Sequence, residues 1–590
     1  MAALPWNRSH SCGALRVADV GAEVRLMGWV GRVRDLGGIL FIDLRDREGV
    51  TQAVVRAESG EPTVQVARSL GSEWVVAVRG RVAQRAPGTV KASLPTGEIE
   101  VTAAEIVVLS EAKTPPFLPE DDLTVSEEVR LKYRYLDLRR PGMQRRLAIR
   151  SQLALAARRY LESQGFYEIE TPFLTKSTPE GARDYLVPSR VHHGSFYALP
   201  QSPQLFKQLL MIAGLDRYFQ VARCFRDEDF RHDRQPEFTQ IDLEMSFVSE
   251  DDVFQVVEGI FAYILSQALG ARIETPFPRF TWTEVMHRYG SDKPDLRYGS
   301  GIVDVSEVFS GSGYAIFERA LAEKGRVRAL AAPGCARYSR KELEGLEALA
   351  KEQGAAGLGW ARWTEAELTS PLAKHVGEVR LREAFGRAAG AAGDLLLLVA
   401  GEPLKASRVL GALRNHLAHR EEWAKEGDWR FLWVTEFPLF EYDQNQGRWV
   451  SSHHPFTAPH PEDLDKVESD PGAVRSRAYD VCANGYELGS GSIRIHRSDL
   501  QARIFRALRL SEEEVREKFG FFLEALQYGT PPHGGIALGF DRICMLAASG
   551  KSLRDVIAFP KTTSAFDLMT GSPSPVTEEQ LRLLALQLRS

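Results

Sequence analysis

A charged loop followed by an alternating strand stands out at residues 223–247 (RCFRDEDFRHDRQPEFTQIDLEMSF). In the last part, apolar and polar residues alternate, which places Gln240, Asp242 and Glu244 on one face of a strand. The loop ahead of them carries several arginines and carboxylates. Arginines that face fixed carboxylates suit a zwitterion and a triphosphate together, and a solvent-facing hairpin is the alternative interpretation.

Residues 534–546 (GGIALGFDRICML) predict a short strand that turns at Gly539 into a helix. The first helical turn contains Asp541 and Arg542, and a cation there opposes the helix dipole unless it faces an anion. A phosphate group at the helix N-terminus, held by Arg542, removes that conflict. A solvated arginine is the alternative interpretation.

Two carboxylates, Asp480 and Glu487, lie near a glycine-rich turn in YDVCANGYELGSGSIRIH (479–496), and Arg494 follows on a β-type segment. Glycines let a backbone approach a ligand closely. Mg²⁺ commonly binds one or two carboxylates together with phosphate oxygens. The stretch is therefore compatible with a magnesium site, and equally with an ordinary turn flanked by charges.

The segment ILFIDLRD (39–46) alternates like a half-buried strand, which puts Phe41 on the polar face beside Asp43 and Arg45. An exposed aromatic ring among arginines such as Arg34 is a platform on which a nucleic-acid base can stack. A partly buried edge phenylalanine is the alternative interpretation.

The composition is that of a large globular protein: 590 residues, 44% hydrophobic and 26% charged, with a net charge of −5. It excludes a disordered chain and a strongly basic nucleic-acid binder of the histone type. The five cysteines lie far apart in the sequence, so neither a zinc site nor a disulfide framework is expected. The sequence shows no signal pattern and no apolar run of membrane length, and we expect a cytoplasmic protein without a membrane partner.

The pattern along the chain predicts five regions that must position these residues. The first contains five short β-branched strands, which suggest a small barrel of the OB type, and the second is a proline-rich linker. A helix is expected at about 144–164, and Ser339 with Glu342 forms a capping box in a separate α+β module. The predicted regions are 1–110, 111–145, 146–300, 301–420 and 421–590.

Taken together, these stretches resemble the class II aminoacyl-tRNA synthetases, and within them the bacterial aspartyl-tRNA synthetases. The resemblance covers essentially the whole chain. Segments similar to the three class motifs are GFYEIETP (165–172), FRDED (225–229) with RQPEFTQID (234–242), and GFDR (539–542). Segments similar to subfamily signatures are STPEGARDYLVP (177–188), QSPQLFKQLL (201–210), SHHPFT (452–457) and RDVIAFPK (554–561).

The resemblance implies an α+β multidomain fold. An N-terminal OB-fold β-barrel binds the anticodon, and a catalytic domain with an antiparallel sheet flanked by helices is interrupted by an inserted module of the GAD type. It implies an aspartate–tRNA ligase that converts L-aspartate and ATP to aspartyl-adenylate and pyrophosphate. The aspartyl group then passes to the 3′ end of tRNA(Asp). The partners implied are L-aspartate, tRNA(Asp) and a second copy of the chain, with Pro172 at the dimer interface and no DNA.

Site residues are carried over position by position. The aspartate contacts of the family fall on Glu180, Gln204, Lys207, Arg226, Asp242, His453 and Arg494. The ATP contacts fall on Arg226, Asp227, Glu228, Gln235, Glu487, Gly539, Phe540, Asp541 and Arg542. Mg²⁺ falls on Asp480 and Glu487, and the anticodon on Arg34, Leu36, Phe41 and Gln52. We interpret Arg226, Glu487 and Arg542 as catalytic.

The chemistry accounts for these residue types. The substrate carboxylate itself attacks the α-phosphorus, so the protein supplies positioning and charge compensation. We expect a preassembled cationic cradle made of Arg226, Arg494, Arg542 and a divalent ion.

The sequence departs from the family pattern at four places. Phe540 replaces the usual leucine, the glycine segment reads LGSGS, and the barrel loop 86–98 has Pro87 and Lys91 where many bacterial members have Glu and Asn. Leu36 stands where members that also charge tRNA(Asn) often have histidine, which favours tRNA(Asp) alone. The alternatives are a non-discriminating enzyme, an asparaginyl or lysyl enzyme, an RNA-binding protein without catalysis, and a tRNA-independent amide synthetase.

Overall fold

The computed structural model describes residues 6–177, 182–228, 230, 232–425 and 427–589. The chain folds into two compact units. The first unit comprises residues 1–148, 558–560 and 566–573, and the second comprises residues 149–557, 561–565 and 574–590.

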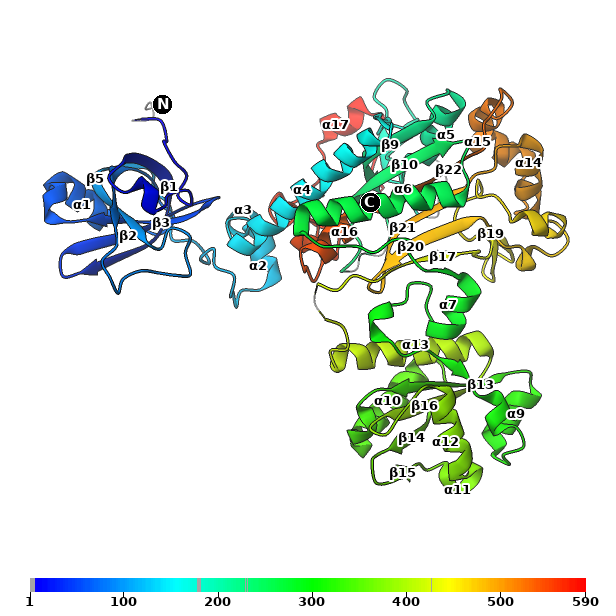
Figure 1. Cartoon of the computed structure of the whole chain (residues 1–590). Coiled ribbons are helices and arrows are strands. Elements are labelled where there is room, and N and C mark those ends of the chain that lie inside the picture. The colour runs from blue at the N-terminus through cyan, green and yellow to red at the C-terminus, as the bar shows by residue number, and fades with distance from the viewer. Residues whose placement is uncertain (1–5, 178–181, 229, 231, 426, 590) are drawn as a thin grey trace. The chain divides into compact units, whose positions relative to one another are not determined.

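A closed five-stranded barrel, ordered β1-β2-β3-β5-β4, forms the N-terminal part of the first unit (blue in Figure 1). Its strands are β1 (Glu23–Leu36), β2 (Ile39–Asp46), β3 (Gly49–Val55), β4 (Val75–Gln84) and β5 (Ile99–Ser110). Alternating residues of β1 and β2 point inward, so that Leu26, Val30 and Ile42 are fully buried in the barrel core. The predicted five-stranded barrel is confirmed, and a short helix α1 (Glu61–Ser69) between β3 and β4 adds to it.

The proline-rich stretch 112–126 after the barrel forms no helix or strand, as expected for a linker, and two short helices follow it within the predicted region 111–145. These helices are α2 (Glu127–Lys132) and α3 (Arg134–Asp137), and the long helix α4 (Pro141–Ser163) comes next. The buried carboxylate of Asp137 accepts hydrogen bonds from Arg134 at 2.5 Å and Arg140 at 2.8 Å. Helix α4 is the helix expected at about 144–164. It begins about three residues earlier, at Pro141, and proline suits the first turn of a helix.

An eight-stranded sheet dominates the second unit, in the order β11-β17-β20-β21-β22-β10-β9-β6. The pairs β6·β9 and β11·β17 are parallel and the other neighbours are antiparallel. The strands are β6 (Tyr167–Glu168), β9 (Arg217–Phe225), β10 (Glu237–Ser246), β11 (Arg279–Thr281), β17 (Phe431–Thr435), β20 (Ala478–Ala483), β21 (Tyr486–Ile493) and β22 (His533–Gly539). Two hairpins flank it: β7 (Leu186–Pro188) with β8 (Phe196–Ala198), and β18 (Phe440–Asp443) with β19 (Arg448–Ser451).

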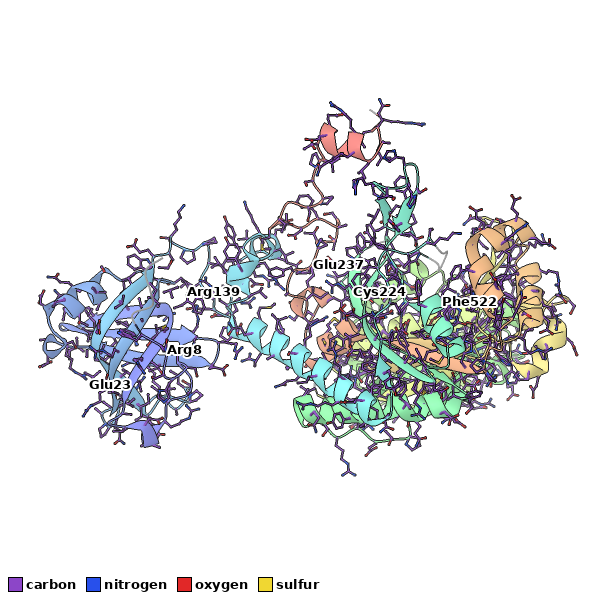
Figure 2. The ribbon with its side chains drawn as sticks, turned by 90° about the horizontal axis from the view of Figure 1, so that it is seen from above. Arg8, Glu23, Arg139, Cys224, Glu237 and Phe522 are labelled. Carbon is purple, nitrogen blue, oxygen red and sulfur yellow. The ribbon has the colours of Figure 1, made fainter. Side chains whose placement is uncertain are left out.

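Helices cover this sheet and bury its apolar face. They are α4, α5 (Gln204–Ile212), α6 (Glu250–Leu269), α7 (Trp282–Tyr289), α14 (Ser498–Ala507), α15 (Glu512–Ala525) and α16 (Phe540–Ala547). A further short helix, α17 (Glu578–Leu583), lies near the C-terminus. Figure 2 shows Phe522 of α15 and Cys224 of β9, both of which are fully buried. Among the described residues, α6 alone has the length and hydropathy of a membrane span, and half of that stretch is buried inside the protein. Its buried side chains belong to the main core, so α6 is the core helix of this unit.

A second, smaller sheet forms the inserted module between β11 and β17, in the order β12-β13-β16-β14-β15. Its strands are β12 (Val303–Asp304), β13 (Arg326–Ala332), β14 (Gly359–Trp363), β15 (Leu368–Thr369) and β16 (Leu395–Gly401). Its helices are α8 (Ser306–Phe309), α9 (Ala315–Ala322), α10 (Arg340–Glu352), α11 (Ala373–Val376), α12 (Glu378–Arg387) and α13 (Pro403–Arg420). Consecutive residues of β16 are buried because separate cores cover both sheet faces. The capping box of Ser339 and Glu342 is confirmed, and the predicted region boundaries stay predictions.

Candidate active site

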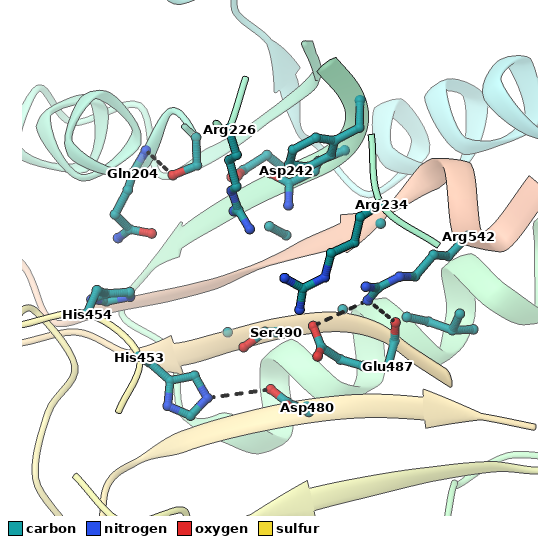
Figure 3. Close-up of a pocket in the computed structure, with 18 of the residues that line it drawn as sticks. Gln204, Arg226, Arg234, Asp242, His453, His454, Asp480, Glu487, Ser490 and Arg542 are labelled. Carbon is teal, nitrogen blue, oxygen red and sulfur yellow. Dashed lines mark hydrogen bonds and ion pairs between the residues drawn. The ribbon is translucent and has the colours of Figure 1, made fainter. Parts of the chain in front are cut away.

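A cavity of about 480 Å³ opens over the middle strands of the eight-stranded sheet (Figure 3). The guanidinium-bearing residues Arg226, Arg494 and Arg542 all line it, although they are far apart in the sequence. The sequence-predicted residues that line it are Gln204, Lys207, Arg226, Glu228, Gln235, Asp242, His453, Asp480, Glu487, Arg494, Gly539, Asp541 and Arg542.

Strand register explains how β10 presents its polar face. Asp242 lies opposite Ala537 of β22, and Glu244 lies opposite Gly535. A Cβ atom at Gly535 would lie 2.1 Å from Oε2 of Glu244, which is closer than real atoms approach. The small residues of β22 therefore leave the room that the two carboxylates of β10 occupy.

Four charged side chains meet at the inner end of the cavity, and we call them the ionic cluster: Lys207, Asp242, Glu244 and Arg494. The Nζ atom of Lys207 lies 2.7 Å from Oδ1 of Asp242 and 3.3 Å from Oε2 of Glu244. Arg494 donates to both carboxylate oxygens of Glu244, at 2.9 and 3.1 Å. All four side chains are at most 1% exposed. The cluster is thus a desolvated ion network.

The charges within the ionic cluster are balanced. Burial raises the pKa of Asp242, and Lys207 opposes that rise. Burial also acts to raise the pKa of Glu244, but Arg494 and Lys207 outweigh it, so that pKa is lowered. Two cations face two carboxylates before any ligand arrives. Glu244, to which the sequence patterns assigned no role, is therefore the counter-ion of Arg494.

Several buried polar atoms on the cavity wall have no hydrogen-bond partner among the described residues. They are Nε2 of Gln204, Oδ2 of Asp242, Oγ of Ser452 and Oδ1 of Asp480. Buried polar groups are nearly always satisfied in native proteins, because an unpaired one costs about 1–3 kcal/mol. These atoms therefore indicate a polar ligand with both donors and acceptors.

The other end of the cavity is more open. Arg542, on the first turn of α16, donates to the Glu487 carbonyl at 3.0 Å and lies 3.5 Å from Oδ2 of Asp233. The Arg226 guanidinium stacks 5.1 Å from the centre of the Phe238 ring. Cations placed at a helix N-terminus and beside an aromatic ring suit phosphate groups.

Asp480 and Glu487 form the predicted carboxylate pair. Burial, and next the charge of Glu487, raise the pKa of Asp480 well above its usual range. Oδ1 of Asp480 has no hydrogen-bond partner within the described ranges, and Nε2 of His453 lies 3.9 Å from it (Figure 3). A divalent cation would relieve this repulsion. Within the described ranges no group of three or more His, Cys, Asp or Glu side chains could hold a metal ion, so the pair fits a cation that takes its other ligands from phosphate and water.

The glycine segment differs from its expectation. LGSGS lies in strand β21, whereas the turn is at Asn484 and Gly485, which have φ of 54° and 85°. A Cβ atom at Gly491 would lie 2.2 Å from the Gly535 carbonyl oxygen. Glycine is thus required there by the neighbouring strand, and the positive φ angles belong to the short turn before it.

Glu180, a predicted aspartate contact, lies outside the described residues. Two other predicted residues do not present a side chain to the cavity. Asp227 is not on the cavity wall, and it pairs with Arg183 at 3.4 Å. The ring of Phe540 is buried in the main core.

Two predicted ATP contacts line the cavity but use their side chains structurally. The amide of Gln235 bonds to the Lys561 backbone at 2.9 and 3.1 Å. The carboxylate of Asp541 accepts hydrogen bonds from the Thr239 amide and from Arg150, which ties α16 to β10.

The predicted anticodon residues lie on neighbouring barrel strands. Arg34 is directly opposite Phe41, and it donates to Asp43 at 2.9 Å. Leu36 is 64% exposed. Gln52 is only 6% exposed and donates to Glu100 at 3.5 Å, so an RNA contact through its side chain requires that hydrogen bond to open.

Sequence reasoning assigned no role to two residues here: Glu244 of the ionic cluster, and His454, which contacts the cluster. Glu244 shares the polar face of β10 with Asp242, so the two-residue period contained the signal. Nε2 of His454 lies 2.8 Å from Nη1 of Arg494. Burial and the charge of Arg494 lower the pKa of His454 well below its usual range. Nδ1 on the other side of the ring accepts from the Phe456 backbone N–H at 3.2 Å, and it lies 3.4 Å from the Thr457 hydroxyl.

Comparisons with known proteins agree with this geometry. The family described as tRNA synthetases class II (D, K and N) matches residues 126–563, and the OB-fold nucleic acid binding domain matches residues 24–109. An aspartate–tRNA(Asp/Asn) ligase of Moorella thermoacetica is 54% identical, over 98% of this chain and 97% of its own. An aspartate–tRNA ligase of Geobacillus kaustophilus is 52% identical, over 98% of each chain.

One solved structure shows the same fold. The asparaginyl-tRNA synthetase of Pyrococcus horikoshii, in complex with asparaginyl-adenylate, aligns with a TM-score of 0.59 at 20% identity, over 94% of this chain and 98% of its own.

Proposed function

The chain belongs to the class II tRNA synthetases of the D, K and N group, and we propose that it is an aspartate–tRNA ligase. It activates L-aspartate with ATP and then transfers the aspartyl group to the 3′ end of tRNA(Asp). Relatives with that activity in their names are 52–54% identical over nearly the whole chain. The observation that carries the proposal is one cavity lined by three members of the ionic cluster, Lys207, Asp242 and Arg494, and also by Arg226, Arg542 and the carboxylate pair.

The ionic cluster accounts for recognition of aspartate. Oδ2 of Asp242 is buried and unpaired, so it accepts from the α-ammonium group of the substrate. The side-chain carboxylate of the substrate binds Lys207 and Arg494, and it replaces His454 and Ser492 as the acceptor for Nη1 of Arg494. Asparagine would turn an amide NH₂ toward these donors and leave one unpaired, so the pocket rejects it strongly.

The phosphate end supports the first chemical step. A carboxylate oxygen of aspartate forms a bond to the α-phosphorus, the bond to the bridging oxygen breaks, and pyrophosphate leaves with that electron pair. Arg226 orients the attacking carboxylate and the α-phosphate, and Arg542 binds the terminal phosphate at the start of α16. Mg²⁺ held by Asp480 and Glu487 would supply further positive charge to the phosphate oxygens.

A non-discriminating activity is the second candidate. The Moorella relative is named for both tRNA(Asp) and tRNA(Asn), whereas the exposed Leu36 on the barrel favours tRNA(Asp) alone by family resemblance. We place tRNA on the barrel face that carries Arg34 and Phe41. Charging assays with each purified tRNA separate the two candidates.

We also propose a cytoplasmic homodimer, without DNA or a membrane as partner. Four large apolar side chains on α4, β6 and the segment after β6 are about half exposed or more: Leu155, Tyr167, Phe173 and Leu174. Exposed large apolar side chains concentrated in the segment 155–174 support an interface there. Sedimentation that gives twice the mass of one chain supports the dimer, and sedimentation as a monomer at micromolar concentration contradicts it.

The activity itself is tested by ATP–pyrophosphate exchange with aspartate, asparagine and lysine in turn. We expect exchange with aspartate alone. Exchange driven equally well by asparagine or lysine would reassign the enzyme within the family, and no exchange with any amino acid would leave an RNA-binding protein.

A further inference from the structure

A buried arginine joins the inserted module to the catalytic site. Arg414 on α13 is 1% exposed, and its Nε and Nη2 atoms donate to the carbonyls of Ser300 at 2.6 Å and Asp295 at 2.9 Å. Its guanidinium also lies 5.0 Å from the ring centre of Tyr289 and 5.2 Å from that of Tyr298. Burying a guanidinium is costly unless such contacts offset the cost. They therefore fix residues 291–300, which we call the α7 loop.

The α7 loop starts from a rigid point. A Cβ atom at Gly290 would lie 2.0 Å from the Ser407 carbonyl oxygen, and one at Gly411 would lie 2.4 Å from the Tyr289 carbonyl oxygen. The end of α7 and the middle of α13 thus meet backbone to backbone. The inserted module holds both ends of the α7 loop.

The α7 loop reaches the phosphate end of the active site. Asp292 lines the catalytic cavity. Lys293 lines a second cavity of about 580 Å³, which shares Asp233, Glu487 and Arg542 with the first. The Asp292 carbonyl accepts from Sγ of Cys482 on β20 at 3.7 Å, two residues from Asp480. The loop therefore lies against the strand that carries the carboxylate pair.

Lys293 is the residue of this loop that suits phosphate. It is exposed, and it forms no ion pair with any residue in the described part of the chain. Its charge acts on Asp480 together with that of Glu487, because both affect the pKa of that carboxyl. The neighbouring Arg297 is different, since its guanidinium is already paired with Asp295 at 2.6 Å.

We propose that Lys293 binds the outer phosphates of ATP, and that Arg414 is a positioning residue that holds Lys293 there through the α7 loop. This inference rests on the proposed function, because it assumes that the triphosphate lies beside Glu487 and Arg542. It gives the inserted module a role in the activation step: the module fixes a cation at the phosphate end. A prepositioned cation binds phosphate without the cost of ordering a mobile side chain.

The test uses the variants Lys293→Met and Arg414→Gln and their double variant. The control is Arg408→Gln, which changes an exposed arginine on α13, the helix that carries Arg414. The dissociation constants of ATP with Mg²⁺ and of L-aspartate are measured by calorimetry, beside the melting temperature. We expect ATP to bind about tenfold more weakly to Lys293→Met and about fivefold more weakly to Arg414→Gln. Aspartate affinity should change less than about twofold in every variant, and Arg408→Gln should match the wild type.

The double variant tests whether Arg414 acts through Lys293. If it does, ATP binds the double variant about as weakly as Lys293→Met alone; multiplied losses would show independent effects and overturn the proposal. Wild-type ATP affinity in Lys293→Met would also overturn it, and this variant stays informative if Arg414→Gln does not fold. An equal loss of aspartate and ATP binding in Arg414→Gln would show a general structural defect and contradict the positioning role. Absence of aspartate-dependent exchange in the wild type would instead refute the proposed function.

Discussion

The two ends of the catalytic cavity differ in how far their cations are buried and in how closely carboxylates pair with them. In the ionic cluster, Lys207 and Arg494 are buried beside two carboxylates, at most 1% exposed. At the phosphate end, the Arg542 side chain is 22% exposed and its nearest carboxylate oxygen is 3.5 Å away. One end is dry and compensated by the protein, and the other is open and only loosely compensated.

The difference matches the two substrates. A small amino acid must be told from its amide by a few polar atoms, and desolvation makes each unmatched atom costly. A triphosphate brings much charge of its own and is accompanied by a cation, so an open, cationic end is sufficient to bind it. Stability and activity should therefore be coupled at the ionic cluster and separable at the phosphate end.

The largest effect is expected for Arg494→Ala. The substrate carboxylate loses its fork-type partner, and Glu244 is left buried without its main counter-ion. Aspartate-dependent exchange should fall by about 10³-fold or more in kcat/KM, and the free energy of unfolding should drop by about 3–5 kcal/mol. Chemical denaturation and exchange kinetics measure both.

A matched double variant sharpens that test. Arg494→Met with Glu244→Gln removes both charges, so it should recover much of the stability and none of the activity. Exchange at the wild-type KM for aspartate in Arg494→Ala would refute the assigned role.

Arg542→Ala should separate the two properties. Because this guanidinium is partly exposed, its loss should change the free energy of unfolding by less than about 1 kcal/mol. The kcat/KM for ATP should fall by about 10²-fold, since the terminal phosphate loses its charge partner. A variant that loses stability as much as Arg494→Ala does would break the comparison between the two ends.

The carboxylate pair should make cation binding dependent on pH. Asp480 must be ionised to bind a divalent cation, and its pKa is raised, so lowering the pH through that pKa protonates it and weakens binding. At pH values below that pKa, each increase of one pH unit should raise the affinity for Mn²⁺, measured in the presence of ATP, by up to about tenfold. Without metal, the repulsion grows as the pH rises, so the stabilisation by Mn²⁺ should be larger at high pH. A flat profile in the wild type, or a pH dependence that persists unchanged in Asp480→Asn, would contradict this account.

The smallest effect on catalysis is expected far from the cavity in sequence, at Phe41→Ala. Loss of a stacking ring should weaken tRNA binding by about tenfold and leave tRNA-independent exchange unchanged. The KM for tRNA(Asp) in charging assays measures this loss. The control is Arg47→Ala, in the turn that follows the strand of Phe41. Equal losses of charging and exchange would rule out a role confined to tRNA.

The sequence predicted those features that depend on residues close together in the chain. The alternation in ILFIDLRD gave strand β2, the residues Ser339 and Glu342 gave the start of α10, and Gly539 gave the passage from β22 to α16. Motif order predicted that Arg226, Arg494 and Arg542 line one cavity. The site residues beyond that juxtaposition stay predictions.

What the sequence could not give depends on contacts between distant segments. The pairing of Arg494 with Glu244 joins residues 250 positions apart, so no local pattern reveals that the charges cancel. The glycines of LGSGS look like a turn, because glycine is common in turns, but the adjacent carbonyl of Gly535 is what excludes a side chain at Gly491. The link from Arg414 to the α7 loop is of the same kind.

A crystal structure of the protein with L-aspartate tests the central claim most directly. The account predicts the ligand ammonium on Oδ2 of Asp242, and the ligand side-chain carboxylate on Lys207 and on Nη1 of Arg494 with His454 displaced. A ligand bound elsewhere, with Oδ2 of Asp242 still unpaired and Arg494 still bonded to His454, would contradict it.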